Sequence, residues 1–416
     1  MKTQIEHARD GKVTPQCRSV AKKEGIGPEI IASRICGGSI VIMSRGTCSV
    51  GIGEGLRTKV NVNIGTSSEK HDPQEEVRKA KIAEMYGADT ISDLSMGPDI
   101  GGTRNLIFKN TFLPITTVPI YQTASEIGIK EMTGQDIIRT IRAQAEEGVS
   151  SFVLHCVSNS VLSSYKKNKR ILGVVSKGGS ITSAYMLLNQ CENPFIENFE
   201  TVLSILKKYD IVLSLGNTMR SGCIHDARDR AQVAEIRENI GLANKAHKAG
   251  VQVIIEGVGG HVRIDKIADH VKFHKRLAKY PLFVAGPLPT DVAMGYDHIA
   301  GCAGASIASG AGADYLCYIT PAEHLGLPTP DHVREGLIAF RIAAHIGDSV
   351  KYGLSPADAS VSRNRADLNW EGQFCNALDP EKARLMAPRS GPCSMCGDFC
   401  AIKIMRELSR QIIPQK

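Results

Sequence analysis

The sequence predicts an α/β protein whose main part is a (β/α)8 barrel of the TIM type. Eight short runs rich in β-branched and apolar residues recur along the chain, and most begin roughly 25 to 40 residues apart. Between them lie segments such as 72–87 and 133–148, with acidic residues early and apolar residues at i, i+3 and i+4, as in amphipathic helices. Alternation of this kind is typical of parallel βαβ units. The eight runs are residues 59–65, 89–95, 115–122, 151–156, 210–217, 251–257, 282–286 and 314–320.

The remaining segments do not follow this repeat. Residues 171–180 resemble a strand but follow the fourth run too closely to leave room for a crossover helix, so we expect a long loop there. The glycine-rich stretch 51–55 is also expected to be a loop, because no dinucleotide-binding strand–helix unit follows it. We therefore predict an N-terminal region (1–58), the barrel (59–345), a helical segment (346–385) and a tail (386–416).

Composition and charge exclude several classes of partner. The chain has 416 residues and a formal net charge of +7, with no Lys/Arg block dense enough for a nucleic-acid groove. A small anionic substrate suits this balance better than a polymer. The first residues lack the apolar core of a signal peptide, and the longest uncharged stretch, 298–313, is too short to span a bilayer. We expect a cytoplasmic protein without a membrane or nucleic-acid partner.

Twelve cysteines without an export signal indicate a reducing compartment, where thiols pack, react or bind metal. Nine are scattered and are interpreted as core filler: Cys17, Cys36, Cys48, Cys156, Cys191, Cys223, Cys302, Cys317 and Cys375. The other three, Cys393, Cys396 and Cys400, have C-x2-C-x3-C spacing. A structural zinc site needs four ligands, and a disulfide contradicts the compartment. Three thiolates suit a 4Fe–4S cluster with one iron free to bind S-adenosylmethionine, which is the interpretation we favour.

Polar residues recur where the predicted strands end. In a (β/α)8 barrel these carboxyl ends meet at the active-site face, whereas the interior is expected to hold Val, Ile and Leu. We therefore expect a pocket there. The strand-end residues are Asn63, Asp93, Tyr121, His155, Ser176 to Gly178, Asn217, Glu256, Thr320 and His324.

Four of the loops that follow the strands contain residues that could bind an anion or a metal ion. Residues 175–180 form a glycine-rich turn with a lysine, a plausible phosphate cradle, and Asn217 or Arg220 could hold the same anion or its ribose. His261 and His324, possibly with Glu256, could hold a divalent metal, although both histidines could instead cap turns.

The chain resembles the thiamin pyrimidine synthase family over nearly its whole length. The resemblance is carried, in order, by the motifs ARDGKVTPQ, NVNIGTSS, GADTISDLSMG, TVPIYQTASE, VVSKGGSI, SLGNTMRSGCIHDA, GPLPTDVAMGYDHI, CYITPAEHLGLP, WEGQFCNALDP and CSMCGDFCAIKI. It implies radical S-adenosylmethionine chemistry on aminoimidazole ribotide, an external electron donor, and a homodimer in which one subunit's tail closes over the partner's barrel.

The resemblance also assigns roles. Substrate contacts fall on Asn63, Tyr121, His155, Ser176, Gly178, Arg220 and Glu256, and those positions where this chain departs from the family add Ser92, Lys177, Asn217 and Phe283. The ligands of a divalent metal, zinc or iron, fall on His261 and His324, and the cluster ligands on the three tail cysteines. Glu256 and His155 are the candidates for proton transfer or hydroxyl binding.

The departures lie mostly around the substrate. The family usually has Met, Arg, Asp and Tyr where Ser92, Lys177, Asn217 and Phe283 stand. The segment before His261 is one residue longer, and the tail spacing one residue shorter. This pattern favours the paralogous branch that makes 5-hydroxybenzimidazole for the lower ligand of cobalamins. The alternatives are hydroxymethylpyrimidine phosphate synthesis for thiamin, a metal-dependent barrel lyase or hydrolase with a zinc tail, and a non-enzymatic scaffold.

Overall fold

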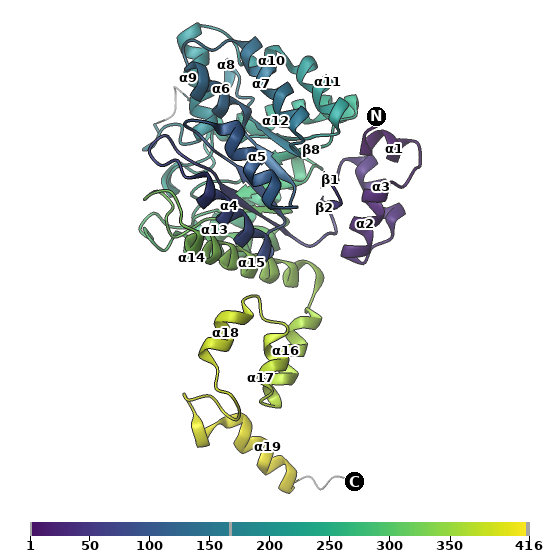
Figure 1. Ribbon diagram of the computed structural model, residues 1–416, viewed down its shortest axis with the longest axis vertical. Helices are drawn as coiled ribbons and strands as arrows, with labels where there is room; N and C mark the ends of the chain where they lie inside the picture. The colour runs from purple at the N-terminus through teal and green to yellow at the C-terminus, as the bar shows by residue number, and fades with distance from the viewer. Residues whose placement is uncertain (1, 166–168, 413–416) are drawn as a thin grey trace. The chain divides into compact units, whose positions relative to one another are not determined.

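The structure is a computed structural model that describes residues 2–165 and 169–412, and the chain divides into two compact units. The first, Met1–Lys351, contains the barrel, and the second, Tyr352–Lys416, contains the cysteine tail (Figure 1). None of the described helices is long and apolar enough to cross a membrane.

All eight predicted strands form, and they close into one parallel barrel in the order β10-β3-β4-β5-β6-β7-β8-β9. Closure is completed by β10, which pairs in parallel with both β3 and β9. The predicted fold class is therefore confirmed. The strands are β3 Lys59–Ile64, β4 Thr90–Asp93, β5 Ile115–Thr117, β6 Ser151–Leu154, β7 Val212–Leu215, β8 Val253–Glu256, β9 Leu282–Ala285 and β10 Tyr315–Cys317.

Helices surround the barrel, and the amphipathic ones bury an apolar face. In α7, for example, Thr133 and Asp136 form a capping box at the start, and Ile137, Ile138 and Ile141 are buried. Residues 171–176 contain no strand and α9 begins at Lys177, so the loop predicted over 171–180 gives way to a helix at its end. The helices are α4 Pro73–Met85, α5 Ile100–Asn110, α6 Pro119–Ile127, α7 Gly134–Glu147, α8 Asn159–Tyr165, α9 Lys177–Asn189, α10 Pro194–Glu197, α11 Phe199–Tyr209, η1 Ile224–Asp226, α12 Arg230–Ala249, α13 Ile264–Leu277, α14 Asp297–Gly310 and α15 Pro330–Tyr352.

The N-terminal region is more regular than expected. After α1 (Gln4–Arg9), α2 (Pro15–Glu24) and α3 (Pro28–Gly37), an antiparallel hairpin forms from β1 (Ile40–Arg45) and β2 (Cys48–Gly53). The prediction of a loop over 51–55 is therefore wrong for its first three residues. Gly51 serves packing, because a Cβ there would lie 2.5 Å from the side chain of Val20.

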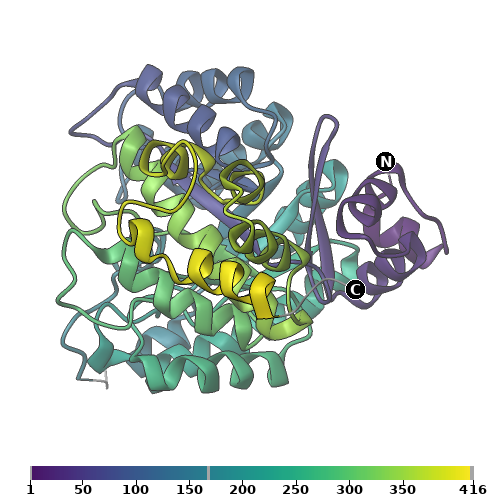
Figure 2. The ribbon, with the colours of Figure 1, turned by 90° about the horizontal axis from the view of Figure 1, so that it is seen from below.

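The hairpin covers the amino-terminal end of the barrel. Its Ile42 exchanges backbone hydrogen bonds with the Gln252 side chain just before β8, with N–H to Oε1 at 2.7 Å. Val41 and Ile52 pack against Val212 at the start of β7. Figure 2 shows the hairpin standing between the three N-terminal helices and the barrel. With this end covered, the open face of the barrel is the one at the carboxyl ends of the strands.

The barrel interior is more polar than expected. Asn61 Oδ1 accepts hydrogen bonds from Thr90 (2.9 Å), Ser92 (3.1 Å) and Tyr315 (3.2 Å). The prediction of an interior filled by Val, Ile and Leu is wrong at this layer. The layer lies directly below the carboxyl ends of the strands, where Asn61 Nδ2 donates to Asn63 Oδ1 at 2.8 Å.

The second unit consists of short helices and the cysteine segment. Trp370 Nε1 donates to the carbonyl of Gly391 at 2.9 Å, and Arg384 pairs with Glu371 at 2.6 Å. These contacts connect the first helices of the unit with the segment that leads to Cys393. The elements are α16 Pro356–Ala366, α17 Trp370–Phe374, α18 Pro380–Met386, η2 Gly397–Phe399 and α19 Ala401–Ile412.

Candidate functional site

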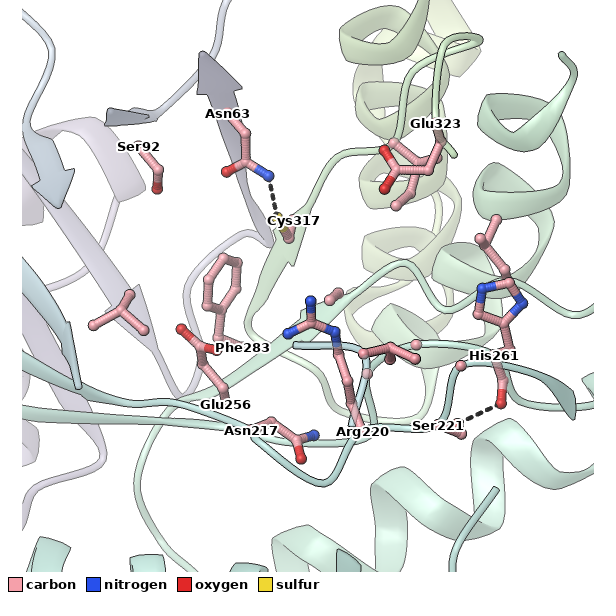
Figure 3. Close-up of a pocket in the computed structure, with 18 of the residues that line it drawn as sticks. Asn63, Ser92, Asn217, Arg220, Ser221, Glu256, His261, Phe283, Cys317 and Glu323 are labelled. Carbon is pink, nitrogen blue, oxygen red and sulfur yellow. Dashed lines mark hydrogen bonds between the residues drawn. The ribbon is translucent and has the colours of Figure 1, made fainter. Parts of the chain in front are cut away.

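The carboxyl ends of the strands surround a cavity of about 330 Å³ (Figure 3). This is the face at which (β/α)8 barrels carry their active sites. Ten of the residues singled out in the sequence line it: Asn63, Ser92, Tyr121, His155, Asn217, Arg220, Glu256, His261, Phe283 and His324.

Apart from Val175, which lines the cavity, the glycine-rich turn lies behind this wall rather than on it. Ser176 caps α9 by accepting from Gly179 N–H at 3.1 Å, and its hydroxyl contacts His155 Nε2 at 2.8 Å. A Cβ at Gly178 would lie 2.6 Å from the ring of His155, so only glycine fits there. The ammonium of Lys177 lies 5.3 Å from the centre of the Tyr121 ring. The turn therefore supports two side chains of the cavity wall.

Two strand-end residues do not line the cavity. Asp93 accepts hydrogen bonds from the backbone (3.0 Å) and the hydroxyl (2.5 Å) of Ser95, and Thr320 accepts from Ala322 N–H at 3.2 Å. Both side chains stabilise the turn that follows their own strand. The expectation that they face the pocket is wrong, because a short polar side chain at a strand end is also a local turn former.

Arg220 carries the positive charge of the cavity. Its guanidinium reaches into the space beside Glu256 and Phe283 (Figure 3). No ion pair to this guanidinium is found within residues 2–165 and 169–412. It still acts electrostatically on its surroundings, since it lowers the pKa of Glu256 and of Glu323 against the larger effect of burial. A partly buried cation without a carboxylate partner is suited to bind an anionic ligand.

Two ionisable groups of the wall have strongly shifted pKa values. Burial raises the pKa of Glu256 to about 7, although Arg220 and a 3.1 Å hydrogen bond from Ser214 favour its ionised form. Burial, assisted by Arg220, lowers the pKa of His155 to about 3. Glu256 can therefore take up or release a proton near neutrality, whereas His155 remains a neutral hydrogen-bonding group.

His261 and His324 lie together, with ring centres 5.2 Å apart. Each has a carboxylate beside Nδ1: Asp291 at 2.6 Å from His261 and Asp297 at 3.8 Å from His324. A carboxylate on one ring nitrogen orients a histidine that binds metal through the other nitrogen. The pair therefore fits a divalent metal ion.

The sequence did not single out three further residues of the cavity wall. Cys317, interpreted as core filler, accepts a hydrogen bond from Asn63 Nδ2 at 3.0 Å, and Tyr318 donates to the Asn63 carbonyl at 2.9 Å. Glu323 precedes His324 and faces the cavity (Figure 3). Its position directly beside a candidate metal ligand was the one signal in the sequence.

Glu235 holds the loop that carries Asn217 and Arg220. From α12, its two carboxylate oxygens accept the backbone N–H groups of Thr218 and Met219, each at 2.7 Å. Glu235 is 1% exposed. Two short bonds to consecutive N–H groups fix the direction in which the loop leaves β7, and with it the position of the guanidinium.

The tail thiols have the donor chemistry of a cluster site. Cys393, Cys396 and Cys400 are all free thiols. In the turn between the first two, Gly397 N–H donates to the Cys393 carbonyl at 3.0 Å, which keeps Cys393 and Cys396 close in space. The backbone N–H groups of Cys396 and Met395 lower the pKa of the Cys393 thiol. Since metals and clusters bind the thiolate form, this local backbone fits three-cysteine ligation.

A barrel mouth with an unpaired cation, in a chain that also carries three free thiols at close spacing, fits the class of barrel enzymes that use a 4Fe–4S cluster to start radical chemistry on S-adenosylmethionine. The chain belongs to the Radical SAM ThiC family, whose family model matches residues 3–407.

Relatives of nearly equal length support this membership. A phosphomethylpyrimidine synthase of Dehalococcoides mccartyi is 46% identical over 97% of each chain. Proteins of the same name from Geobacter metallireducens (97% of each chain) and Thermoanaerobacter sp. (97% of this chain, 98% of the relative) are each 44% identical. Among solved structures, Xanthomonas albilineans dihydropteroate synthase is 11% identical with a TM-score of 0.44, covering 76% of this chain and 99% of its own.

We predict that Glu235→Gln weakens substrate binding by about tenfold. One of the two backbone N–H groups would then face an amide NH2, and leaving a buried donor without an acceptor costs about 1–3 kcal/mol. The dissociation constant of aminoimidazole ribotide, the substrate that the family resemblance implies, tests this when it is measured calorimetrically. Glu238→Gln, on the same helix but bonded to Ser158 N–H at 3.3 Å, is the control. Equal effects of the two substitutions would contradict the role assigned to Glu235.

A second prediction concerns Glu256. Its raised pKa means that, between about 4.5 and about 7, the folded state retains a proton that the unfolded chain has lost, so this group lowers stability progressively as pH rises over that range. We expect Glu256→Gln to gain about 1–3 kcal/mol relative to wild type between pH 5.5 and pH 8. Urea unfolding at both pH values measures this gain. Exposed Glu69→Gln is the control, and a gain independent of pH would contradict the shift.

Proposed function

We propose that this protein is a phosphomethylpyrimidine synthase, which converts aminoimidazole ribotide to hydroxymethylpyrimidine phosphate. The observation that carries the proposal is the 44–46% identity, over nearly the whole of both chains, to relatives of that name. The cavity of about 330 Å³ with one unpaired guanidinium suits a small ligand with a phosphate group.

Different residues of the cavity are proposed to bind different parts of the substrate. Arg220 attracts the phosphate, and the start of α9, with Ser176 and Gly178, supports the wall beside it. Asn63, held by Asn61 and Cys317, offers a rigid amide for the heterocycle or sugar. His155 stays neutral and holds a hydroxyl group. Glu256, with a pKa of about 7, accepts or returns a proton during the rearrangement.

The cofactors follow from the family and from the donor sets. When bound, a 4Fe–4S cluster and S-adenosylmethionine supply a radical that abstracts hydrogen from the ribose. Cys393, Cys396 and Cys400 would hold the cluster. His261 and His324, each backed by a carboxylate, would hold a divalent metal, zinc or iron. An external donor would supply the electron.

We also propose a homodimer in which the tail of one subunit closes over the barrel of its partner. The tail belongs to a compact unit distinct from the barrel unit, as an arm that serves a second subunit would require. Closure would exclude water and oxygen from the radical.

A second candidate product is 5-hydroxybenzimidazole, made from the same substrate. The observation that favours it is the position of the residues at which this chain differs from the usual family pattern. Ser92, Asn217 and Phe283 line the cavity, and Lys177 lies against Tyr121. Substitutions that line the substrate cavity affect the path by which a substrate radical rearranges more than they affect the formation of that radical.

Product identity tests the proposal. We expect anaerobically reconstituted enzyme, given aminoimidazole ribotide, S-adenosylmethionine and a reductant, to form hydroxymethylpyrimidine phosphate, detected by mass. Cys396→Ser should abolish product formation, whereas Cys375→Ser, at an exposed thiol of the same unit, should not. Formation of 5-hydroxybenzimidazole would overturn the first candidate in favour of the second. A colourless protein with stoichiometric zinc in the tail would overturn both.

A further inference from the structure

The loops after β7, β8 and β9 are joined into one platform at the barrel mouth. His261 N–H donates to the carbonyl of Ser221 at 3.0 Å, and the Ser221 hydroxyl donates to the carbonyl of His261 at 2.6 Å (Figure 3). On the other side, Val262 N–H donates to Leu288 and Leu288 N–H donates to Gly260, both at 2.9 Å. Side chains from three separate loops are thereby held in fixed relation.

This platform brings Cys223 and His225, for which the proposed reaction has no use, next to Asp291, the carboxylate that backs His261. The ligand atoms of Cys223, His225 and Asp291 all lie within 4.8 Å of one another. Cys223 is buried, whereas His225 and Asp291 are exposed, so the cluster opens to solvent on one side. From the sequence, Cys223 is interpreted as core filler, because Asp291 is distant in the chain and one histidine two residues away is not a recognisable metal motif.

We propose that Cys223, His225 and Asp291 form a second cation site, for a borderline-soft divalent ion such as Zn²⁺ or Fe²⁺. Thiolate, imidazole and carboxylate together are a donor set that these ions accept and that Mg²⁺ and Ca²⁺ do not prefer. Three protein ligands leave one position of a tetrahedral site open to water or another ligand.

Hydrogen bonds to neighbouring groups hold the Asp291 carboxylate and the Cys223 thiol in position. Ile224 N–H donates to Asp291 Oδ2 at 3.1 Å, which holds the carboxylate against the turn that carries the other two ligands. Without an ion, the Cys223 thiol donates to Asp226, whose carboxylate also accepts the N–H groups of Ile171 and Leu172 at 2.9 Å. Ion binding replaces that thiol proton by the metal, and Asp226 keeps its two backbone bonds.

Asp291 connects this site to the histidine pair. Its Oδ1 lies 2.6 Å from His261 Nδ1, so the same carboxylate serves His261 and the new cluster. The second site is nevertheless distinct, because its thiolate and its imidazole come from the β7 loop. An ion bound there would withdraw charge from the carboxylate that orients His261. The inference does not depend on which product the enzyme makes.

Cobalt titration of the full chain tests the site. The background variant carries serine at Cys393, Cys396 and Cys400, so that tail thiols cannot bind metal. We expect Co²⁺ to produce a thiolate-to-cobalt charge-transfer band that Cys223→Ser abolishes together with one metal equivalent. His225→Ala, at an exposed position, should weaken the binding that produces this band at least about tenfold. Cys191→Ser, a partly buried thiol outside the cluster, is the matched control and should change neither.

The contrary results are equally specific. Absence of the band in the background variant, or a band unchanged by Cys223→Ser and His225→Ala, would overturn the inference. Thermal unfolding of each variant checks that the chain still folds, and if Cys223→Ser does not fold, His225→Ala decides. The pair His261→Ala and His324→Ala should remove a metal equivalent that produces no thiolate band, which separates this site from the one in the proposed function.

Discussion

Pairing of β10 with both β3 and β9 is the constraint on which the candidate site depends. It closes the barrel, and closure brings the carboxyl ends of eight strands, from Lys59 to Cys317 in the chain, to one mouth. Residues separated by more than 250 positions then meet directly: Asn63, at the end of β3, donates to Cys317, at the end of β10. The β1–β2 hairpin covers the opposite end.

Within that mouth, the pKa values of the carboxyl groups depend on burial and on the unpaired guanidinium of Arg220. Burial alone would drive Glu256 and Glu323 toward their neutral forms, and Arg220 opposes this without forming an ion pair with either. An anion that binds the guanidinium would remove this opposition and favour protonated carboxyl groups beside it. Binding of such an anion would therefore couple to proton availability through Arg220, whose loop is held by Glu235.

Periodicity was sufficient to predict the barrel and much of its mouth, because each strand ends at the same face and polar residues there are rare in a core. It failed where one residue type has two physical uses. Gly51 looks like a loop glycine but lies in β2, where it leaves room for the side chain of Val20. Asp93 looks like a cavity residue but accepts hydrogen bonds within its own turn. Cys223 and Cys317 look like core thiols, because the sequence does not reveal which buried cysteine lines a cavity or lies beside other metal-binding side chains.

We propose that the barrel mouth presents the ribose of a bound ribotide to radical attack. Anaerobic turnover with aminoimidazole ribotide deuterated on its ribose tests this most directly, because the hydrogen removed from the sugar is transferred to 5′-deoxyadenosine. We expect 5′-deoxyadenosine heavier by one deuterium. Unlabelled 5′-deoxyadenosine from an enzyme that consumes the ribotide, with every ribose position labelled in turn, would contradict it.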